Sequence, residues 1–164
     1  MSQKDIILPF SEFDMDRILV DRDGINEVNL QRFEMQQLDA IVVEDLDRLV
    51  CVGYKDATPD EFWVRGHMPG MPLMPGVIMC EAAAQLASYF ATRHHLLGDG
   101  AIGLGGLEGV RFRNVVLPGN RLVLMSQMTK VRRGALIVCR FQGFVNEQIV
   151  VEGEIKGIPL PKTI

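Results

Sequence analysis

Residues 75–95, PGVIMCEAAAQLASYFATRHH, constrain the fold more than any other part of the sequence. Pro75 suits a first helical turn and Gly98 lies just beyond the last residue, so the stretch predicts one helix of roughly 30 Å. Its apolar side chains would point in nearly every direction around the axis: Val77, Ile78, Met79, Ala82, Ala83, Ala84, Leu86, Ala87, Phe90 and Ala91. A helix that is apolar all round is a buried helix.

Strand patterns supply the layer that such a helix needs. Residues 49–54 (LVCVGY) are typical of a strand, and β-rich runs follow at 121–131, 135–145 and 148–158, separated by Arg-Arg-Gly and Asn-Glu. This spacing predicts an antiparallel meander. A sheet and a buried helix each need the other to cover an apolar face, so we expect an α+β fold with an antiparallel sheet wrapped around one long central helix.

Composition favours one soluble, cytoplasmic domain over residues 1–164. The chain has 48% hydrophobic residues and a net charge of -4, which gives no reason to expect nucleic acid or a membrane as partner. Cys51, Cys80 and Cys139 are too widely spaced for a disulfide framework or a metal site, so we expect reduced thiols. The amino terminus lacks the pattern of a signal peptide. The glycine-rich run 103–106 lacks a following Gly-Lys-Ser/Thr and is expected to form a turn.

Polar side chains form one stripe on the predicted helix: Glu81, Gln85, Ser88 and Thr92, spaced four, three and four apart. A carboxylate in an apolar setting must be paired, hydrogen-bonded or protonated, so Glu81 needs a reason to be there. One reason is chemistry. The alternative is that Glu81 reaches the surface or pairs with an arginine such as Arg111 or Arg113.

A rigid loop precedes the helix, because prolines recur every third residue at positions 69, 72 and 75. His67 begins this loop and could act there as a general base, although a lone histidine is more often structural. The loop ends at the helix start, where Gly76 would let a substrate oxygen approach unpaired N–H groups at the positive end of the dipole. A base, an acid and an electrophilic site are what proton abstraction beside a carbonyl requires.

The stretch GHMPGMPLMPGVIMCEAAAQ resembles the signature of the beta-hydroxyacyl-[acyl carrier protein] dehydratases of bacterial fatty acid synthesis. The resemblance extends to residues 32–41, to 110–113 and to 118–120, and covers roughly residues 25–158. It implies a hot-dog fold and a homodimer, often assembled as a trimer of dimers, in which His67 of one subunit works with Glu81 of its partner. A glutamate at position 81 favours the general dehydratases over the dehydratase-isomerases, which have aspartate there.

Three features depart from the family pattern. Met68 stands where phenylalanine is usual, Asn120 stands where aspartate is common, and residues 1–24 form an extension without a counterpart. The two substitutions affect the expected chain-length preference more than the chemistry, since neither removes a reacting group.

The resemblance implies elimination of water from a (3R)-3-hydroxyacyl thioester on an acyl carrier protein, giving a trans-2-enoyl thioester with no metal or redox cofactor. His67 and Glu81 would be catalytic, and the candidate substrate-binding residues are Met68, Pro75, Gly76, Val77 and Gln85, of which Gln85 would orient Glu81. His94 and His95, at the expected helix end, are given no catalytic role. Two alternatives stay open, a hot-dog acyl thioesterase and a non-catalytic acyl-binding subunit.

Two further surfaces have alternative interpretations. Met68, Met71, Met74 and Met79 could line an acyl channel or only fill gaps between subunits. Residues 109–146 contain no Asp or Glu, and this interval could dock the acidic carrier protein or could simply be solvated strand surface. Its basic residues are Arg111, Arg113, Arg121, Lys130, Arg132, Arg133 and Arg140.

Overall fold

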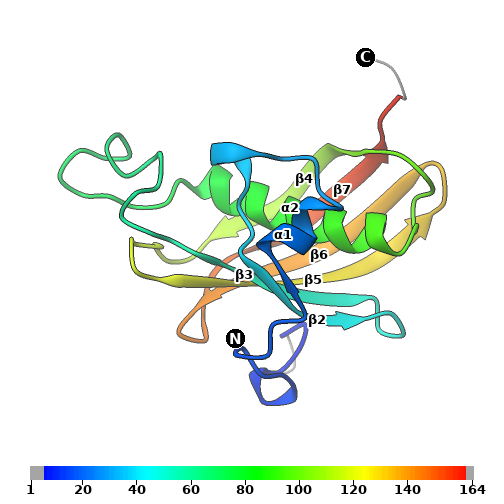
Figure 1. Ribbon diagram of the computed structural model, residues 1–164, viewed down its shortest axis with the longest axis horizontal. Coiled ribbons are helices and arrows are strands. Elements are labelled where there is room, and N and C mark those ends of the chain that lie inside the picture. The colour runs from blue at the N-terminus through cyan, green and yellow to red at the C-terminus, as the bar shows by residue number, and fades with distance from the viewer. Residues whose placement is uncertain (1–5, 162–164) are drawn as a thin grey trace.

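The computed structural model describes residues 6–161, which fold into one antiparallel sheet and one long helix (Figure 1). The seven strands lie in the order β1-β2-β3-β5-β6-β7-β4. Their bounds are β1 Val20–Asp21, β2 Ala40–Asp45, β3 Val50–Asp56, β4 Ile102–Phe112, β5 Arg121–Arg132, β6 Leu136–Val145 and β7 Gln148–Pro159. The helices are α1 Arg22–Asn26 and α2 Gly76–Arg93, with short 3-10 turns η2 Phe10–Glu12 and η3 Phe33–Met35.

Helix α2 lies against one face of the sheet, called here the inner face. Its buried side chains, from Met79 to Ala91, join Ile41, Cys51, Leu122, Leu124 and Phe141 in one core. Gly53 of β3 allows the close approach, because a Cβ there would lie 2.7 Å from the carbonyl oxygen of Ala40 and 3.1 Å from Leu86 Cδ1. The curved sheet around a central helix is the α+β, hot-dog arrangement that the sequence predicted.

Over β2, β3, part of β5 and the Phe144 end of β6, the opposite, outer face of the sheet is also apolar and also buried. Successive side chains of a strand point to opposite faces, and in β3 Val50, Val52 and Tyr54 face outward while Cys51 faces α2. The outer cluster contains Leu8 from the amino-terminal segment, which crosses this face below β2 and β3 in Figure 1. This part of the sheet is therefore covered on both sides.

Most predicted elements agree with the structure. The helix predicted over 75–95 spans Gly76–Arg93, and the predicted strands 49–54, 121–131, 135–145 and 148–158 correspond to β3, β5, β6 and β7. The turn predicted at 103–106 was wrong, because these residues belong to β4. This strand lies at the edge of the sheet with much of its surface exposed, so it lacks an apolar pattern. No helix in the described part of the chain is long and apolar enough to cross a membrane.

Candidate active site

Glu81 lies on the exposed side of α2, where two cavities meet. The larger, about 760 Å³, lies between α2 and residues 28–35, and Glu81, Ser88 and Thr92 line it. The smaller, about 230 Å³, runs between α2 and the sheet, past Ala84 and Ala87. Glu81, Gln31, Ser88 and Ile102 line both. The predicted polar stripe thus faces a groove with an apolar pocket beside it.

Gln85 fixes the carboxyl group of Glu81. Gln85 is only 2% exposed, and its Nε2 donates to Glu81 Oε1 over 2.8 Å and to the carbonyl of Met35 over 2.6 Å. Its Oε1 accepts the backbone N–H of Gln37 over 2.9 Å, which settles the orientation of the amide. Since Gln85 donates to Oε1, that oxygen acts as an acceptor, and any proton on the carboxyl group is favoured on Oε2.

The alternative role for Glu81, an ion pair with Arg111 or Arg113, is not what the structure shows. Arg113 Nη2 instead lies 2.5 Å from Glu152 Oε1. Within residues 6–161, Glu81 takes part in no ion pair. Its carboxyl group is held by an amide in a groove, which leaves it available for chemistry.

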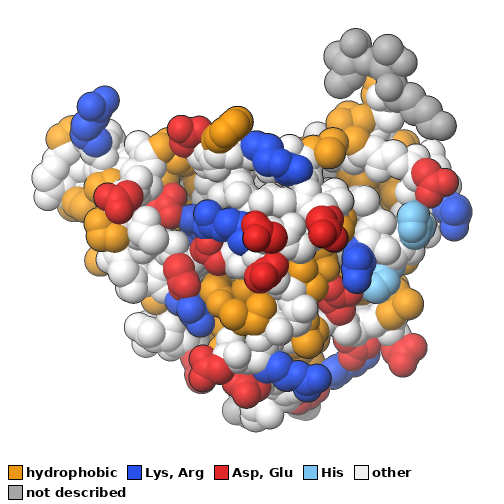
Figure 2. Space-filling model, viewed as in Figure 1, with side chains coloured by type: hydrophobic (Ala, Val, Ile, Leu, Met, Phe, Trp, Pro, Cys, Tyr) orange, Lys and Arg blue, Asp and Glu red, His pale blue; other side chains and the backbone are white. Residues whose placement is uncertain are grey.

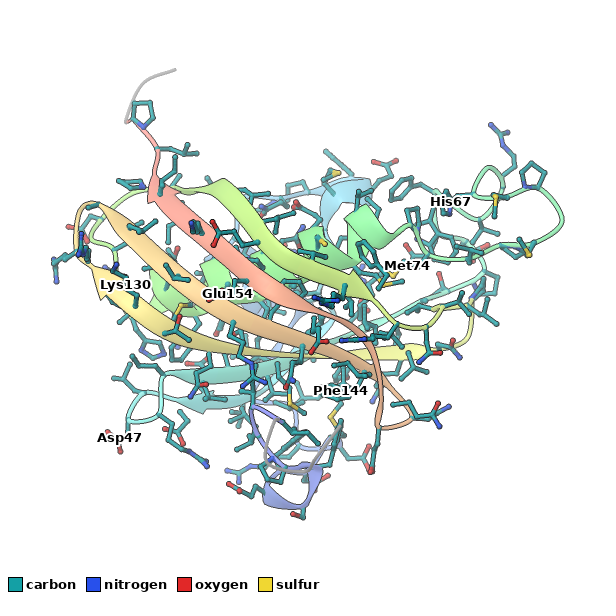
Figure 3. The ribbon with its side chains drawn as sticks, turned by 180° about the vertical axis from the view of Figure 1, so that it is seen from behind. Asp47, His67, Met74, Lys130, Phe144 and Glu154 are labelled. Carbon is teal, nitrogen blue, oxygen red and sulfur yellow. The ribbon has the colours of Figure 1, made fainter. Side chains whose placement is uncertain are left out.

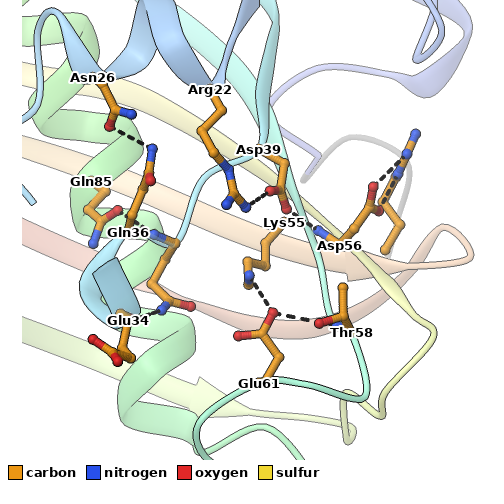
Figure 4. Close-up of polar contacts among 12 residues, drawn as sticks. Arg22, Asn26, Glu34, Gln36, Asp39, Lys55, Asp56, Thr58, Glu61 and Gln85 are labelled. Carbon is orange, nitrogen blue, oxygen red and sulfur yellow. Dashed lines mark hydrogen bonds and ion pairs between the residues drawn. The ribbon is translucent and has the colours of Figure 1, made fainter. Parts of the chain in front are cut away.

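The segment 26–37 closes the larger cavity and is fastened to α2. Asn29 Nδ2 donates to the carbonyl of Gln85 over 3.1 Å. Arg32 braces the segment from within, donating to the carbonyls of Asn26 and Asn29 at 2.9 and 2.7 Å. Figure 4 shows Gln85 near a further contact within this segment, Gln36 with Asn26, and in the same view a buried ion pair, Lys55 with Glu61 at 2.5 Å. Asn29, Met35 and Gln37 were not predicted as partners of Gln85, because each of these contacts uses a backbone atom on one side.

His67 is held by its loop in a defined tautomer. Its backbone N–H donates to the carbonyl of Trp63 over 2.8 Å, and its carbonyl accepts from Leu73 over 2.9 Å. Ring Nδ1 lies 2.9 Å from the carbonyl of Leu73. A carbonyl oxygen only accepts, so Nδ1 bears hydrogen and neutral His67 presents the lone pair of Nε2 as a base.

The structure does not bring His67 and Glu81 together within one chain. His67 lines neither of the two cavities at Glu81. Figure 3 shows it on the loop that projects beyond the start of α2. Each chain therefore presents the two groups at separate places.

The start of α2 is open at its N–H groups. Within the described residues, the N–H groups of Gly76 and Val77 have no hydrogen-bond partner, whereas those of Ile78 and Met79 bond to the carbonyl of Pro75. Val77 is 73% exposed. A Cβ at position 76 would lie 2.6 Å from Phe112 Cε1, so a side chain there would force the half-exposed ring of Phe112 to move.

The four methionines are not near the cavities at Glu81. Met68 and Met71 are exposed on the loop, whereas Met74 and Met79 are buried in the core. None of the four lines the 760 Å³ or the 230 Å³ cavity, so neither cavity opens at these residues.

Some basic side chains of residues 109–146 are paired with acidic side chains of neighbouring strands. Arg113 pairs with Glu152, and Arg121 pairs with Asp56 at 2.7 Å while stacking on the ring of Tyr54. Lys130, Arg132 and Arg133 are exposed around the β5–β6 turn (Lys130 is labelled in Figure 3). This turn, and not the whole interval, is the basic end of the sheet.

His94 and His95 lie at the end of α2 and each contacts a carboxylate. His94 Nε2 lies 2.9 Å from Glu44 Oε2, and Tyr89 donates to the other oxygen of Glu44 over 2.6 Å. Burial, with the Glu44 carboxylate, raises the pKa of Tyr89 far above its usual value. His95 Nδ1 lies 3.0 Å from Asp99 on the surface.

Comparison with known proteins places this chain in a family. Residues 29–154 match the FabA-like domain. The chain is 33% identical over 138 residues to the 3-hydroxyacyl-[acyl-carrier-protein] dehydratase FabZ of Desulfotalea psychrophila, covering 83% of this chain and 91% of that one. It is also 33% identical over 139 residues to the FabZ of Listeria monocytogenes, covering 84% and 94%.

Solved structures share the fold at low sequence identity. The dehydratase heterocomplex ApeI:P of Xenorhabdus doucetiae has a TM-score of 0.72 at 13% identity, covering 85% of this chain and 92% of that one. The PaaI protein of E. coli has a TM-score of 0.57 at 15% identity, covering 72% and 80%. The family model and the two FabZ relatives agree with the resemblance noted in the sequence, and the chain belongs to the FabA-like family of 3-hydroxyacyl-[acyl carrier protein] dehydratases.

Proposed function

We propose that this chain removes water from (3R)-3-hydroxyacyl groups on acyl carrier protein, giving trans-2-enoyl thioesters in fatty acid biosynthesis. The observation that carries the proposal is the carboxyl group of Glu81, oriented by Gln85 at the mouth of an apolar pocket. The relatives named as dehydratases of this class support the same reaction.

The reaction uses three groups of the protein. The N–H of Gly76 donates to the thioester oxygen, which makes the protons on C2 more acidic. His67 Nε2 takes one of these protons. Glu81, in its acid form, gives the proton on Oε2 to the 3-hydroxyl group, which leaves as water. The C2–H and C3–O bonds break and the C2–C3 double bond forms, with no redox cofactor or metal in any step.

We propose that the site is completed by a second copy of the chain. Strand β4 lies at the edge of the sheet, and exposed apolar side chains gather on it and at the start of α2: Val77, Leu104, Leu107 and Phe112. Such a patch is expected to be covered in a homodimer. The partner's His67 would then reach the groove that Glu81 lines. The further assembly into a trimer of dimers rests on the family resemblance alone.

The acyl chain is assigned to the 230 Å³ pocket. Small side chains make room for it on α2, where Ala84 and Ala87 face Ile137 and Cys139 of β6. Met68, Pro75, Gly76 and Val77, on the loop and at the open helix start, are proposed to meet the thioester end. The carrier protein would dock outside this end, and we propose that the enzyme acts on its carrier-bound substrate in the cytoplasm.

The test is absorbance near the enoyl-thioester band when the protein is mixed with a (3R)-3-hydroxyacyl carrier-protein substrate. Wild type should form enoyl product, and His67→Ala should lose about 10²–10⁴-fold in rate, as expected for a positioned acid–base group. His95→Ala is the matched control, because His95 pairs with Asp99 on the surface, and it should keep the wild-type rate.

The other outcomes of this assay would each indicate a different function or mechanism for this chain. Release of free thiol without enoyl product would indicate a thioesterase that uses Glu81 on water or on the thioester. Neither product from a correctly folded protein would indicate a non-catalytic acyl-binding subunit. A His67→Ala variant with near-normal turnover would remove His67 from the mechanism.

A further inference from the structure

The outer face of the sheet has a buried apolar surface that the catalytic groove does not use. Its side chains come from β2, β3, β5 and β6: Ala40, Val42, Val50, Val52, Tyr54, Val123, Met125 and Phe144. On the other face, the alternate residues of the same strands pack against α2. An antiparallel sheet commonly faces water on one side, so a second apolar face requires a second cover.

The amino-terminal segment, residues 6–19, is that cover. Leu8 is 1% exposed within the outer cluster, and Ile6, Ile7, Phe10, Phe13 and Met15 pack around it. The ring of Phe10 meets that of Phe144 edge to face at 5.3 Å. Figure 3 shows Phe144 beside the amino-terminal segment, on the side of the sheet away from α2.

Polar contacts fix the same segment in place. The backbone N–H of Ile7 donates over 2.9 Å to Oε1 of Gln142, a fully buried side chain on the outer face of β6. Arg48, in the β2–β3 turn, pairs with Glu12 at 2.7 Å. The N–H of Leu19 donates to Ile41 over 2.9 Å, which leads the chain into β1. These contacts hold the segment in one position against the outer face of the sheet.

The cover replaces an apolar surface with a charged one. Glu12, Asp14, Asp16 and Arg17 of the segment are exposed. Charged side chains occupy the lower end of the molecule in Figure 2, where Figure 1 places this segment. The segment lies outside the family match, which begins at residue 29.

We propose that residues 6–19 occupy, within each chain, a sheet surface that would otherwise bind the same surface of a second copy. Two apolar sheet faces related by a two-fold axis can pack on each other as in a β-sandwich, and each copy offers the other a surface of the same kind. The segment blocks this contact with its own apolar side chains and adds acidic groups that repel another copy. Assembly is thereby restricted to contacts elsewhere on the chain, such as β4.

The experiment compares the mass of full-length variants by sedimentation over a range of concentrations. The double variant Leu8→Asp/Phe10→Asp should release the segment from the outer face and lower the melting temperature by about 5–15 °C. As the protein concentration rises, it should form species of twice the wild-type mass. Ser11→Asp, which adds a charge at an exposed position of the same segment, should keep the wild-type mass. A synthetic peptide of residues 2–19, added in trans, should reverse the mass increase.

Deletion of residues 2–17 provides a second test that leaves β1 intact. A soluble deletion variant should also double in mass, and the peptide should restore the wild-type value. If this variant precipitates, the peptide should prevent precipitation. Wild-type mass in both the double variant and the deletion variant would overturn the proposal, and so would precipitation that the peptide does not prevent.

Discussion

Gln85 and Glu81 lie one turn apart on α2, and the amide of Gln85 gives Glu81 Oε1 a hydrogen bond of 2.8 Å. The other contacts of the same amide are backbone groups of Met35 and Gln37. The orientation of the carboxyl group therefore depends on a segment that is far from it in sequence.

Gln85→Leu should lower kcat about 10–100-fold with a smaller effect on KM, because a hydrogen bond to an ionisable group contributes roughly 1.5–3 kcal/mol. The variant should also be less stable, since the carbonyl of Met35 and the N–H of Gln37 lose their partner. Steady-state kinetics beside Gln36→Ala provide the check. Gln36 bonds to Asn26 at 2.6 Å and does not contact Glu81, so kcat should change only for Gln85. An equal loss in both variants would contradict the orienting role.

Co-expression of His67→Ala and Glu81→Gln chains with different tags should restore activity that neither homodimer has. A mixed dimer would have one intact site if each site takes His67 from one chain and Glu81 from the other. Random pairing then gives about a quarter of the wild-type rate for the mixture, because half of the two-fold dimers are mixed. Isolated mixed dimers without activity would show that each chain uses its own two residues.

Ala84→Leu should shorten the acyl chains that are accepted. Ala84 lines the 230 Å³ pocket, and a leucine side chain there would fill part of this volume. Relative kcat/KM for short over long substrates should rise at least about tenfold, which corresponds to about 1.4 kcal/mol. Ala135→Leu is the control, because Ala135 is exposed at the β5–β6 turn. An unchanged profile for Ala84→Leu would move the acyl chain out of this pocket.

The buried cysteines should make stability depend on alkaline pH. Burial raises the pKa of Cys139 to about 12 from its usual 9.0, and burial also raises the pKa of Cys51. As pH rises, the folded thiols stay protonated while the unfolded ones ionise. The contribution of the thiols to the free energy of unfolding is therefore full below pH 9.0 and is lost as pH rises toward 12.

Melting temperatures of wild type and Cys51→Val/Cys139→Val, measured from about pH 8 to about pH 11, test this linkage. The double variant should lose less stability over this range. Tyr89 also has a raised pKa and is unchanged in the variant, so a smaller slope should persist. Identical slopes would show that the thiols do not contribute.

The sequence predicts those helices and strands whose pattern of apolar residues follows directly from which of their faces is buried. Helix α2 is apolar all round because it is central, and β5, β6 and β7 are bounded by short polar turns. The first part of β4 was predicted as a turn because an exposed edge strand needs no apolar alternation, and Gly103, Gly105 and Gly106 suggest a turn. The sequence contains one sign that the outer face of the sheet is covered. Val50, Val52 and Tyr54 are apolar although they alternate with residues that already face the inner core, so both faces of β3 are apolar.

The site was predictable to the level of residue types and of the contact between Gln85 and Glu81, which a spacing of one helical turn suggests, but not of the backbone partners. Glu81 is conspicuous as an acid on an apolar helix, and His67 is conspicuous in a proline-fixed loop. The number of residues between His67 and Glu81 does not show that the two side chains lie at separate places in one chain. The contacts that orient Glu81 are backbone groups at positions 35 and 37, and backbone groups leave no mark on residue identity.

The attachment of segment 29–37 to Gln85 has a consequence for inhibition. A compound that bound only the part of the 760 Å³ cavity lined by Asn29 and Met35, without contacting Glu81 or the other residues shared with the acyl pocket, would draw this segment away from α2. Glu81 would lose its orientation while the thioester could still bind. Such a compound would lower the maximal rate at any substrate concentration, and raising the substrate level would not overcome it.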